Sequence, residues 1–257
     1  MIAFVSIFLK YTIFYFILYF VGRAFVIVTN KMFKNEITLP SSILFLKSSL
    51  IYPIIGLVFV GNFLILINFI LPLNSIFVFI FIFLFCLINF TVNKTKSLFR
   101  FININTFFYY IFIPCILLVS TYSISFHYDA GFYHLNHQNW LRESNMILGM
   151  VNIFWAYGMS SIYEYISAIL WFDNSFVYLH FLNLIFVHFF LLVIWDNLLS
   201  KRFKVFQFVA FGILIVSLLD NFGLQGGRNG YIYLDAITKQ DVSVGILFFF
   251  ISIAIFS

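Results

Sequence analysis

Residues 49–70 read SLIYPIIGLVFVGNFLILINFI, an apolar run without a single charged side chain. About 20 such residues cross the hydrocarbon core of a membrane as one helix. A tight turn at 71–74 (LPLN) separates this run from a second apolar run that ends near residue 92. The two runs therefore predict a pair of membrane-spanning helices, 43–70 and 74–92, joined by a short turn.

The rest of the chain has the same character. The sequence of 257 residues is 63% hydrophobic and 9% charged, whereas a soluble domain carries roughly 25% charged residues. This composition excludes a soluble globule, and the short alternating segments of a membrane β-barrel are absent from the sequence. We expect an all-α, polytopic integral membrane helix bundle of about seven spans, at 2–22, 43–70, 74–92, 106–124, 176–199, 203–219 and 243–257.

The two ends of the chain bear on the expected domain. The N-terminal run Ile2–Val21 contains Lys10 and lacks a small-residue cleavage site, so we expect a retained span and not a signal peptide. At the other end, the chain stops at Ser257 within an apolar run that has no closing polar flank. The sequence thus predicts a single transmembrane domain, 1–257, truncated at its C-terminus.

Basic residues in the loops predict the orientation of the chain, because they concentrate in cytoplasmic loops. One set of alternate loops contains Lys31, Lys34, Lys47, Lys94, Lys96, Arg100, Lys201, Arg202 and Lys204. The other set contains only Arg142, Arg228 and Lys239. We therefore expect the first set in the cytoplasm and the N-terminus outside, which makes 125–175 and 220–242 the long exoplasmic loops.

Residues 146–172 (MILGMVNIFWAYGMSSIYEYISAILWF) are apolar enough to look like a further span. One more span there would move the basic segment 201–204 to the outer side, and Asn152, Ser160 and Glu164 interrupt the run with polar groups. Irregular backbone survives at membrane depth only where protein or water satisfies its polar groups. We therefore expect an interfacial or re-entrant segment that is buried against protein.

The stretch 127–140, HYDAGFYHLNHQNW, gathers polar side chains where an apolar run ends. If 129–144 is helical, its side chains form two faces. One face carries Asp129, Tyr133, Asn136, His137, Trp140 and Glu143, and the other carries His134, Gln138 and Arg142. A loop that needs only solubility has no reason to alternate carboxylates, imidazoles and aromatic rings. The pattern favours a site, and simple solvation of the loop is the alternative.

The residue types in this stretch suit the chemistry of a lipid-linked sugar. A carboxylate at the water-facing end of a span can act as a general base toward a sugar hydroxyl, or can hold a divalent cation against a phosphate. Arg142 or Arg228 can neutralise a pyrophosphate. The second polar outer loop, 221–241, can roof a cavity together with the first. These groups fit an enzyme, and they equally fit a carrier that only binds such a lipid.

The segment 128–170 resembles a group of bacterial multi-span proteins encoded in surface-polysaccharide gene clusters. Their pattern is Tyr-Asp-x-Gly-x-Tyr-His-Leu, followed at similar spacing by Trp, Glu, Gly, Asn and Gly-x-x-Ser. The matching residues here are Tyr128, Asp129, Gly131, Tyr133, His134, Leu135, Trp140, Glu143, Gly149, Asn152, Gly158 and Ser161. A looser match lies at 237–241 (ITKQD) and ends in Asp241.

The resemblance implies a bacterial inner-membrane protein of cell-surface polysaccharide or glycolipid biosynthesis that is distantly similar to GT-C glycosyltransferases. It implies transfer or polymerisation of a sugar from a polyprenyl-phosphate-linked donor, with other glycan-assembly proteins as partners. On this basis we expect catalytic roles for Asp129, His134 and Glu143. We expect substrate contacts from Tyr128, Tyr133, Trp140, Arg142, Arg228 and Asp241. One departure is that GT-C enzymes carry their key acid after the first span, whereas Asp129 follows the fourth expected span.

Other polar residues leave further hypotheses open. His180, Asn183 and His188 lie on broadly one side of the expected span 176–199, where they can form the polar path of a carrier or flippase-type transporter. They can equally form interhelical hydrogen bonds, and the bundle can also serve only as a membrane scaffold. The sequence shows no zinc or haem ligand spacing, so no metal ligands are assigned and a divalent cation is the one cofactor considered. The net charge is +5, and the basic residues are scattered over short loops. This distribution does not fit nucleic-acid binding, which needs basic residues gathered on one face.

Overall fold

The structure is a computed structural model of the whole chain. It describes residues 2–33, 48–92, 104–122, 124–172, 175–198, 208, 211–212, 236–237 and 241–256. These residues are mostly helical, as expected. The longer helices are α1 (Ile2–Phe33), α2 (Ser48–Asn68), α3 (Ile76–Val92), α8 (Phe181–Leu198) and α11 (Asp241–Phe256).

Shorter elements connect the longer helices. The fourth expected span consists of four short helical elements. These are α4 (Ile104–Phe107), the π-helix η1 (Phe108–Phe112), α5 (Ile113–Leu118) and the 3-10 helix η2 (Val119–Tyr122). The segment that follows contains β1 (Ser125–Phe126), the π-helix η3 (Ala130–His134), α6 (Leu135–Glu143), η4 (Met150–Asn152), η5 (Trp155–Met159), α7 (Ile162–Ile169) and η6 (Phe176–His180). A two-residue strand, β2 (Ala236–Ile237), precedes α11.

Within the described residues, four helical stretches are long and apolar enough to cross a membrane: Ala3–Phe33, Ser49–Asn68, Asn105–Tyr122 and Phe176–Asp196. They correspond to four of the seven expected spans. The expected spans 74–92 and 243–257 are apolar helices but are shorter, with the qualifying stretches Ile76–Asn89 and Val242–Ile251. The expected span 203–219 lies almost entirely outside the described residues.

Two features differ from the sequence-based expectation, and a third agrees with it. Helix α1 continues to Phe33, so the polar residues after 28 extend the helix and do not begin a loop. The fold is not strictly all-α, because β1 and β2 pair in parallel, Ser125 with Ala236 and Phe126 with Ile237. Within 146–172 the one α-helix is α7, which has 8 residues and is too short to cross a membrane, as expected for that segment.

Helices α1 and α2 approach each other closely at two glycines. A Cβ at Gly22 would lie 2.0 Å from the Tyr52 carbonyl oxygen, and a Cβ at Gly56 would lie 1.9 Å from the Leu18 carbonyl oxygen. No side chain fits at either position, so the two backbones are in direct contact. Small residues at such crossings are typical of helix packing within membranes.

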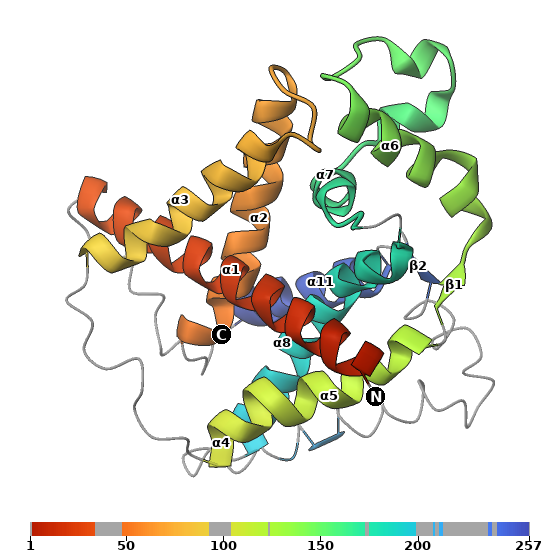
Figure 1. Cartoon of the computed structure of the whole chain (residues 1–257). Coiled ribbons are helices and arrows are strands. Elements are labelled where there is room, and N and C mark those ends of the chain that lie inside the picture. Colours follow the sequence, from red (N-terminus) through yellow and green to blue (C-terminus); the bar gives the residue numbers. More distant parts are fainter. Residues whose placement is uncertain are drawn as a thin grey trace.

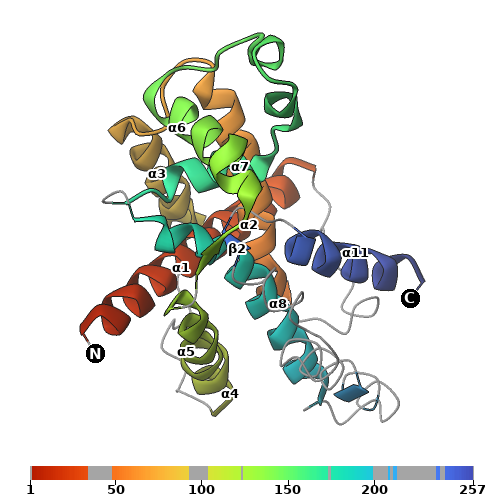
Figure 2. The same ribbon diagram turned by 90° about the vertical axis from the view of Figure 1, so that its right-hand side faces the viewer.

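Helix α8 lies at the centre of the bundle and packs against α2, α5 and α11. Its side chains Leu182, Leu184 and Leu192 have no exposed surface. Figures 1 and 2 show α6 and the segment that follows it at one end of the molecule, with α4 at the opposite end. Helix α7 lies between α6 and α2, and residues 163–169 of α7 are all buried.

The α2–α3 turn contacts the C-terminal end of α6. The backbone N–H of Leu73 donates to the Leu141 carbonyl at 3.0 Å, and the N–H of Met146 donates to the Asn68 carbonyl at 2.8 Å. The Asn68 side chain is fully buried and donates to the carbonyls of Leu141 and Ser144. Asn68 thus mediates packing between separate elements, whereas Asn62 is exposed and donates to the Val58 carbonyl of its own helix.

Candidate functional site

A π-helical turn lies directly before α6. It changes the angular position of the side chains that precede α6 relative to the side chains on α6. Residues 129–143 are helical, as expected, but η3 covers Ala130–His134 and ordinary α-helix begins at Leu135. The face that carries His134, Gln138 and Arg142 is the one that packs against α7 and the residues just after it. The i, i+4 spacing of these three residues therefore identified a real face of the helix.

The centre of this contact is Glu164 of α7, whose side chain is 2% exposed. The Nδ1 atom of His134 contacts Oε1 of Glu164, and the Nε2 amide of Gln138 donates to Oε2 at 2.9 Å. A buried carboxylate is stable only when such donors satisfy it. Both carboxylate oxygens of Glu164 have a donor, so the group is held in one orientation.

The contact fixes the chemistry of His134. Nδ1 faces a carboxylate, which accepts hydrogen bonds, so Nδ1 carries the proton of the neutral imidazole. In a neutral imidazole whose Nδ1 donates, Nε2 is the nitrogen that is able to accept a proton. The His134 side chain is 13% exposed, so the histidine is the accessible member of the pair. We call His134 and Glu164 the dyad.

Further side chains hold Gln138 and α7 in place. The Trp171 indole N–H donates to Oε1 of Gln138 at 2.9 Å. The Arg142 Nη1 group donates to the carbonyls of Ala168 and Trp171 at 2.9 and 3.1 Å, and the guanidinium lies 5.3 Å from the Trp171 ring centroid. A cation at the C-terminal end of a helix satisfies its last carbonyls and its dipole. Arg142 thus has binding partners within the protein.

Residues 4–224 match the family described as a domain of unknown function (DUF8201). The chain belongs to this family. The matched residues include both members of the dyad and all the helices from α1 to α8, apart from the first two residues of α1. Comparisons with curated proteins and with solved structures found no match.

A layer of aromatic rings borders the dyad in this DUF8201 chain. The ring centroids of Tyr133 and His134 are 4.1 Å apart. The Tyr157 ring centroid is 4.9 Å from that of Trp140 and 5.9 Å from that of His137. His137 is buried, and burial lowers its pKa below the ordinary histidine value, although the nearby Glu164 acts in the opposite direction. The neutral form of His137 is therefore favoured.

The structure does not bring the three expected catalytic residues together. Asp129 is mostly buried beside His127, with 3.1 Å between its Oδ2 and the Nδ1 of His127. Glu143 is exposed at the end of α6, about 13 Å along the helix from His134 at 1.5 Å per residue. Of the three, His134 is the one in the dyad, and its carboxylate partner is Glu164.

The residues that we expected to contact the substrate lie in different surroundings. Tyr128 is 77% exposed, while Tyr133 and Trp140 are half-buried in the aromatic layer. Asp241 is the first residue of α11, and Arg228 lies outside the described residues. Among the described residues, no group of three or more His, Cys, Asp or Glu side chains is arranged to hold a metal ion.

Sequence reasoning missed Glu164 as a site residue. It lies 30 positions from His134, within an apolar segment, where the sequence shows it only as an interruption of hydrophobicity. The available signal was that an acid in a buried segment needs a donor, and that the His134 face offered two of them. The same reasoning would have selected Glu164 over the exposed Glu143.

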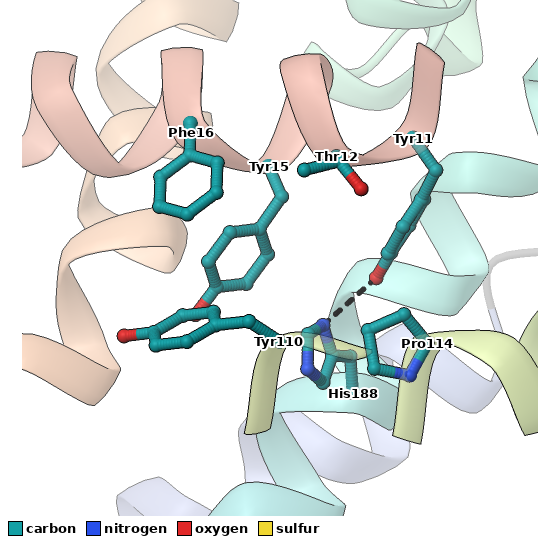
Figure 3. A pocket seen from close by; sticks show the side chains of 7 residues that line it. All are labelled: Tyr11, Thr12, Tyr15, Phe16, Tyr110, Pro114 and His188. Atoms are coloured by element: carbon teal, nitrogen blue, oxygen red, sulfur yellow. Dashed lines mark hydrogen bonds between the residues drawn. The ribbon is translucent and has the colours of Figure 1, made fainter. Parts of the chain in front are cut away.

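A second polar centre lies inside the bundle, on α8. His188 Nε2 is 2.8 Å from the Tyr109 carbonyl oxygen and Nδ1 is 3.0 Å from the Tyr11 hydroxyl. Figure 3 shows His188 and Tyr11 beside a cavity that is also lined by Tyr15, Tyr110 and Pro114. The cavity volume is about 10 Å³, which is room for about one water molecule and far too little for a sugar.

The other polar residues of this centre also connect helices. His180 Nε2 lies 2.8 Å from the Ser120 hydroxyl, and the Asn183 side-chain oxygen accepts from Tyr163 at 3.0 Å and from Ser243 at 3.4 Å. All three contacts join separate elements of the bundle. This geometry favours interhelical hydrogen bonding over a continuous polar path, two alternatives that the sequence left open.

Proposed function

We propose that this protein transfers or polymerises sugars from a polyprenyl-phosphate-linked donor at the outer face of a bacterial inner membrane. The observation that carries the proposal is the contact between His134 and the buried Glu164. A histidine that is oriented by a buried carboxylate and partly open to its surroundings is a suitable general base. The expected outside location of the N-terminus puts the dyad on the outer face.

The chemistry follows from the protonation of the dyad. His134 Nε2 takes the proton of an acceptor hydroxyl as its oxygen attacks the anomeric carbon of the donor sugar. The bond between that carbon and the phosphate oxygen breaks, and the polyprenyl phosphate leaves with the bonding electron pair. Glu164 stabilises the imidazolium that forms, as the aspartate of a serine-protease triad does.

Neighbouring residues have supporting roles in this proposal. Tyr133 and Trp140, which lie in the aromatic layer, offer ring faces to a sugar. Asp129 and Asp241 are the acids that can hold a divalent cation against the donor phosphate, and Tyr128 and Arg228 are further contacts to the substrate. Glu143 is exposed at the C-terminal end of α6, where it can bind an acceptor hydroxyl but cannot orient His134.

The test is complementation of a strain that lacks the gene, with surface glycan as the readout. His134→Gln is expected to lower glycan formation at least about 100-fold, because a general base contributes roughly 10² to 10⁴ in rate. Asn136→Ala is the matched control, since Asn136 is exposed on the same helix and binds only carbonyls of the preceding turn. If His134→Gln supports normal glycan formation while Asp129→Asn abolishes it, the base is Asp129 and the role given to the dyad is wrong.

A carrier without chemistry is the second candidate function. It is favoured by the polar side chains inside the bundle, His180, Asn183 and His188, because polar groups within membranes often mark a transport path. A carrier would depend on these residues and would tolerate His134→Gln. Measuring flip of a fluorescent lipid-linked sugar in vesicles, for His134→Gln and His188→Leu side by side, separates the two candidates.

A further inference from the structure

Lys10 is a cation within the N-terminal half of α1, about 12 Å along the helix axis from Ile2 at 1.5 Å per residue. Its side chain is half-buried. The ammonium nitrogen lies 2.6 Å from the Tyr178 hydroxyl oxygen and 4.5 Å from the centroid of the same ring. A lysine near a membrane surface usually extends its amine toward the headgroups. Here the amine is held against the protein, on a buried tyrosine.

Lys10 has no carboxylate partner among the residues that the structure describes. The ion pairs of those residues join Asp129 to His127 and Glu164 to His134. An ammonium group has three N–H donors, and the Tyr178 hydroxyl accepts one. A cation within an apolar span calls for an anionic partner. The remaining donors of Lys10 are suited to the oxygens of a phosphate group.

The surroundings of Lys10 suit a hydrocarbon chain attached to that phosphate. Val5, Leu9 and Ile13 form a stripe at spacings of four residues along α1, beside Lys10, and each is about half exposed, at 49%, 55% and 59%. An exposed apolar stripe next to a cation can accept the chain and the phosphate of one lipid at the same time. A free phosphate would use only the cation.

Lys10 is linked to the dyad through a short series of contacts. The Tyr178 ring packs edge-on against Phe172 at 5.7 Å between centroids. Trp171 precedes Phe172 in the chain and donates to Gln138, which in turn donates to Glu164. Arg142, the cation of α6 that the sequence suggested for phosphate binding, is bound to carbonyls of the protein. Lys10 can therefore supply the phosphate contact that Arg142 does not.

We infer that Lys10, held by Tyr178, binds the phosphate of the polyprenyl-linked donor, with the isoprenoid chain starting beside Leu9 and running inward along Ile13. This inference rests on the proposed function for the identity of the lipid. Lys10 is a binding residue in this assignment and takes no part in proton transfer. Phospholipids of the bulk membrane carry the same phosphate chemistry and are the competing occupant.

Binding of geranylgeranyl phosphate to the full chain in phosphatidylcholine nanodiscs tests the inference. Lys10→Gln is expected to weaken binding about tenfold, because a charge-assisted hydrogen bond is lost, while Lys10→Arg retains it. Binding of geranylgeraniol, which lacks the phosphate, is expected to be unchanged in both variants. Lys31→Gln, at the opposite end of α1, is the matched control. Lys10→Met serves as a second variant if Lys10→Gln does not fold.

Three results would overturn the assignment. The first is wild-type binding of geranylgeranyl phosphate by Lys10→Gln or Lys10→Met. The second is an equal loss of geranylgeraniol binding, which would make the effect structural. The third is displacement by phosphatidylglycerol or inorganic phosphate at the same concentration as geranylgeranyl phosphate. His134→Gln is expected to bind as wild type does, so loss of the proposed base and loss of the lipid site remain distinguishable.

Discussion

His134, the last residue of η3, and His188 on α8 are both bound to side chains of another element, but they are bound in different ways. His188 is 1% exposed, and both of its nitrogens have partners, the Tyr11 hydroxyl and the Tyr109 carbonyl. His134 is 13% exposed, and its Nδ1 is held by a buried carboxylate. The first arrangement connects helices, and the second fits the base of the proposed function. The two histidines thus differ both in burial and in partners.

The largest expected effect tests whether the dyad also holds the two helices together. Glu164→Ala removes the acceptor of both His134 and Gln138 in a buried contact, so we expect the free energy of unfolding to fall by about 3–5 kcal/mol. Titration with a denaturing detergent measures it. Glu143→Ala is the control, since that acid is exposed, and a change within about 0.5 kcal/mol is expected. Equal effects of the two substitutions would remove the distinction between the buried and the exposed acid.

Arg142, near the C-terminal end of α6, provides a second test of the contact between α6 and α7. Arg142→Ala leaves the carbonyls of Ala168 and Trp171 without their donor, and the expected loss of unfolding free energy is about 2 kcal/mol. Arg142→Lys should recover only part of it, because a lysine cannot reproduce the planar contact with the Trp171 ring. A drop in geranylgeranyl phosphate binding without any loss of stability would show that Arg142 acts as a lipid contact.

A double-mutant cycle between Tyr11→Phe and His188→Leu tests the hydrogen bond between His188 of α8 and Tyr11 of α1. The expected coupling energy is about 0.6 kcal/mol, and at most about 1.7 kcal/mol, as for other hydrogen bonds between membrane helices. Sugar transfer by Tyr11→Phe should stay close to wild type, since the cavity beside His188 holds no more than about one water. Abolished transfer with intact stability would move the active centre from α6 to α8.

The smallest expected effect concerns pH. The pKa of His137 is lowered by burial, so the unfolded chain binds a proton more readily than the folded chain. Stability is therefore expected to fall as the pH drops below about 6.5, the ordinary histidine value, and to be unaffected by this group above it. His137→Gln should flatten the dependence of the unfolding midpoint on pH between about 7 and 5. An unchanged slope would assign the acid sensitivity to another group.

Local patterns in the sequence predicted much of the helical part and one face of the site. Long apolar runs identified four stretches long enough to span a membrane, and the i, i+4 spacing of His134, Gln138 and Arg142 identified the face that meets α7. Glu164 could not be found in this way, because its partner is distant in the chain and its own neighbours are apolar. The extension of α1 to Phe33 was missed because polar residues at a helix end look like the start of a loop.

The sequence also did not predict the side-chain register of the helical turn before α6. Spacing placed Asp129 on the same face as His137, whereas the family resemblance pointed to His134. The π-helical turn of η3 inserts one extra residue per turn and shifts every side chain that precedes it. The residue types of 130–134 do not predict that turn, and the contact that the structure gives Asp129 is with His127, a residue that lies before the helical spacing begins.

The pairing of β1 with β2 joins segments that are more than one hundred residues apart in the chain, Ser125 with Ala236 and Phe126 with Ile237. During synthesis, β1 and the dyad leave the ribosome long before β2 does. The dyad can form only after the chain has been made past residue 164, and the strand pairing must wait until residue 237 has been made. The contacts of this region are thus completed in two stages of biogenesis, the dyad first and the strand pairing afterwards.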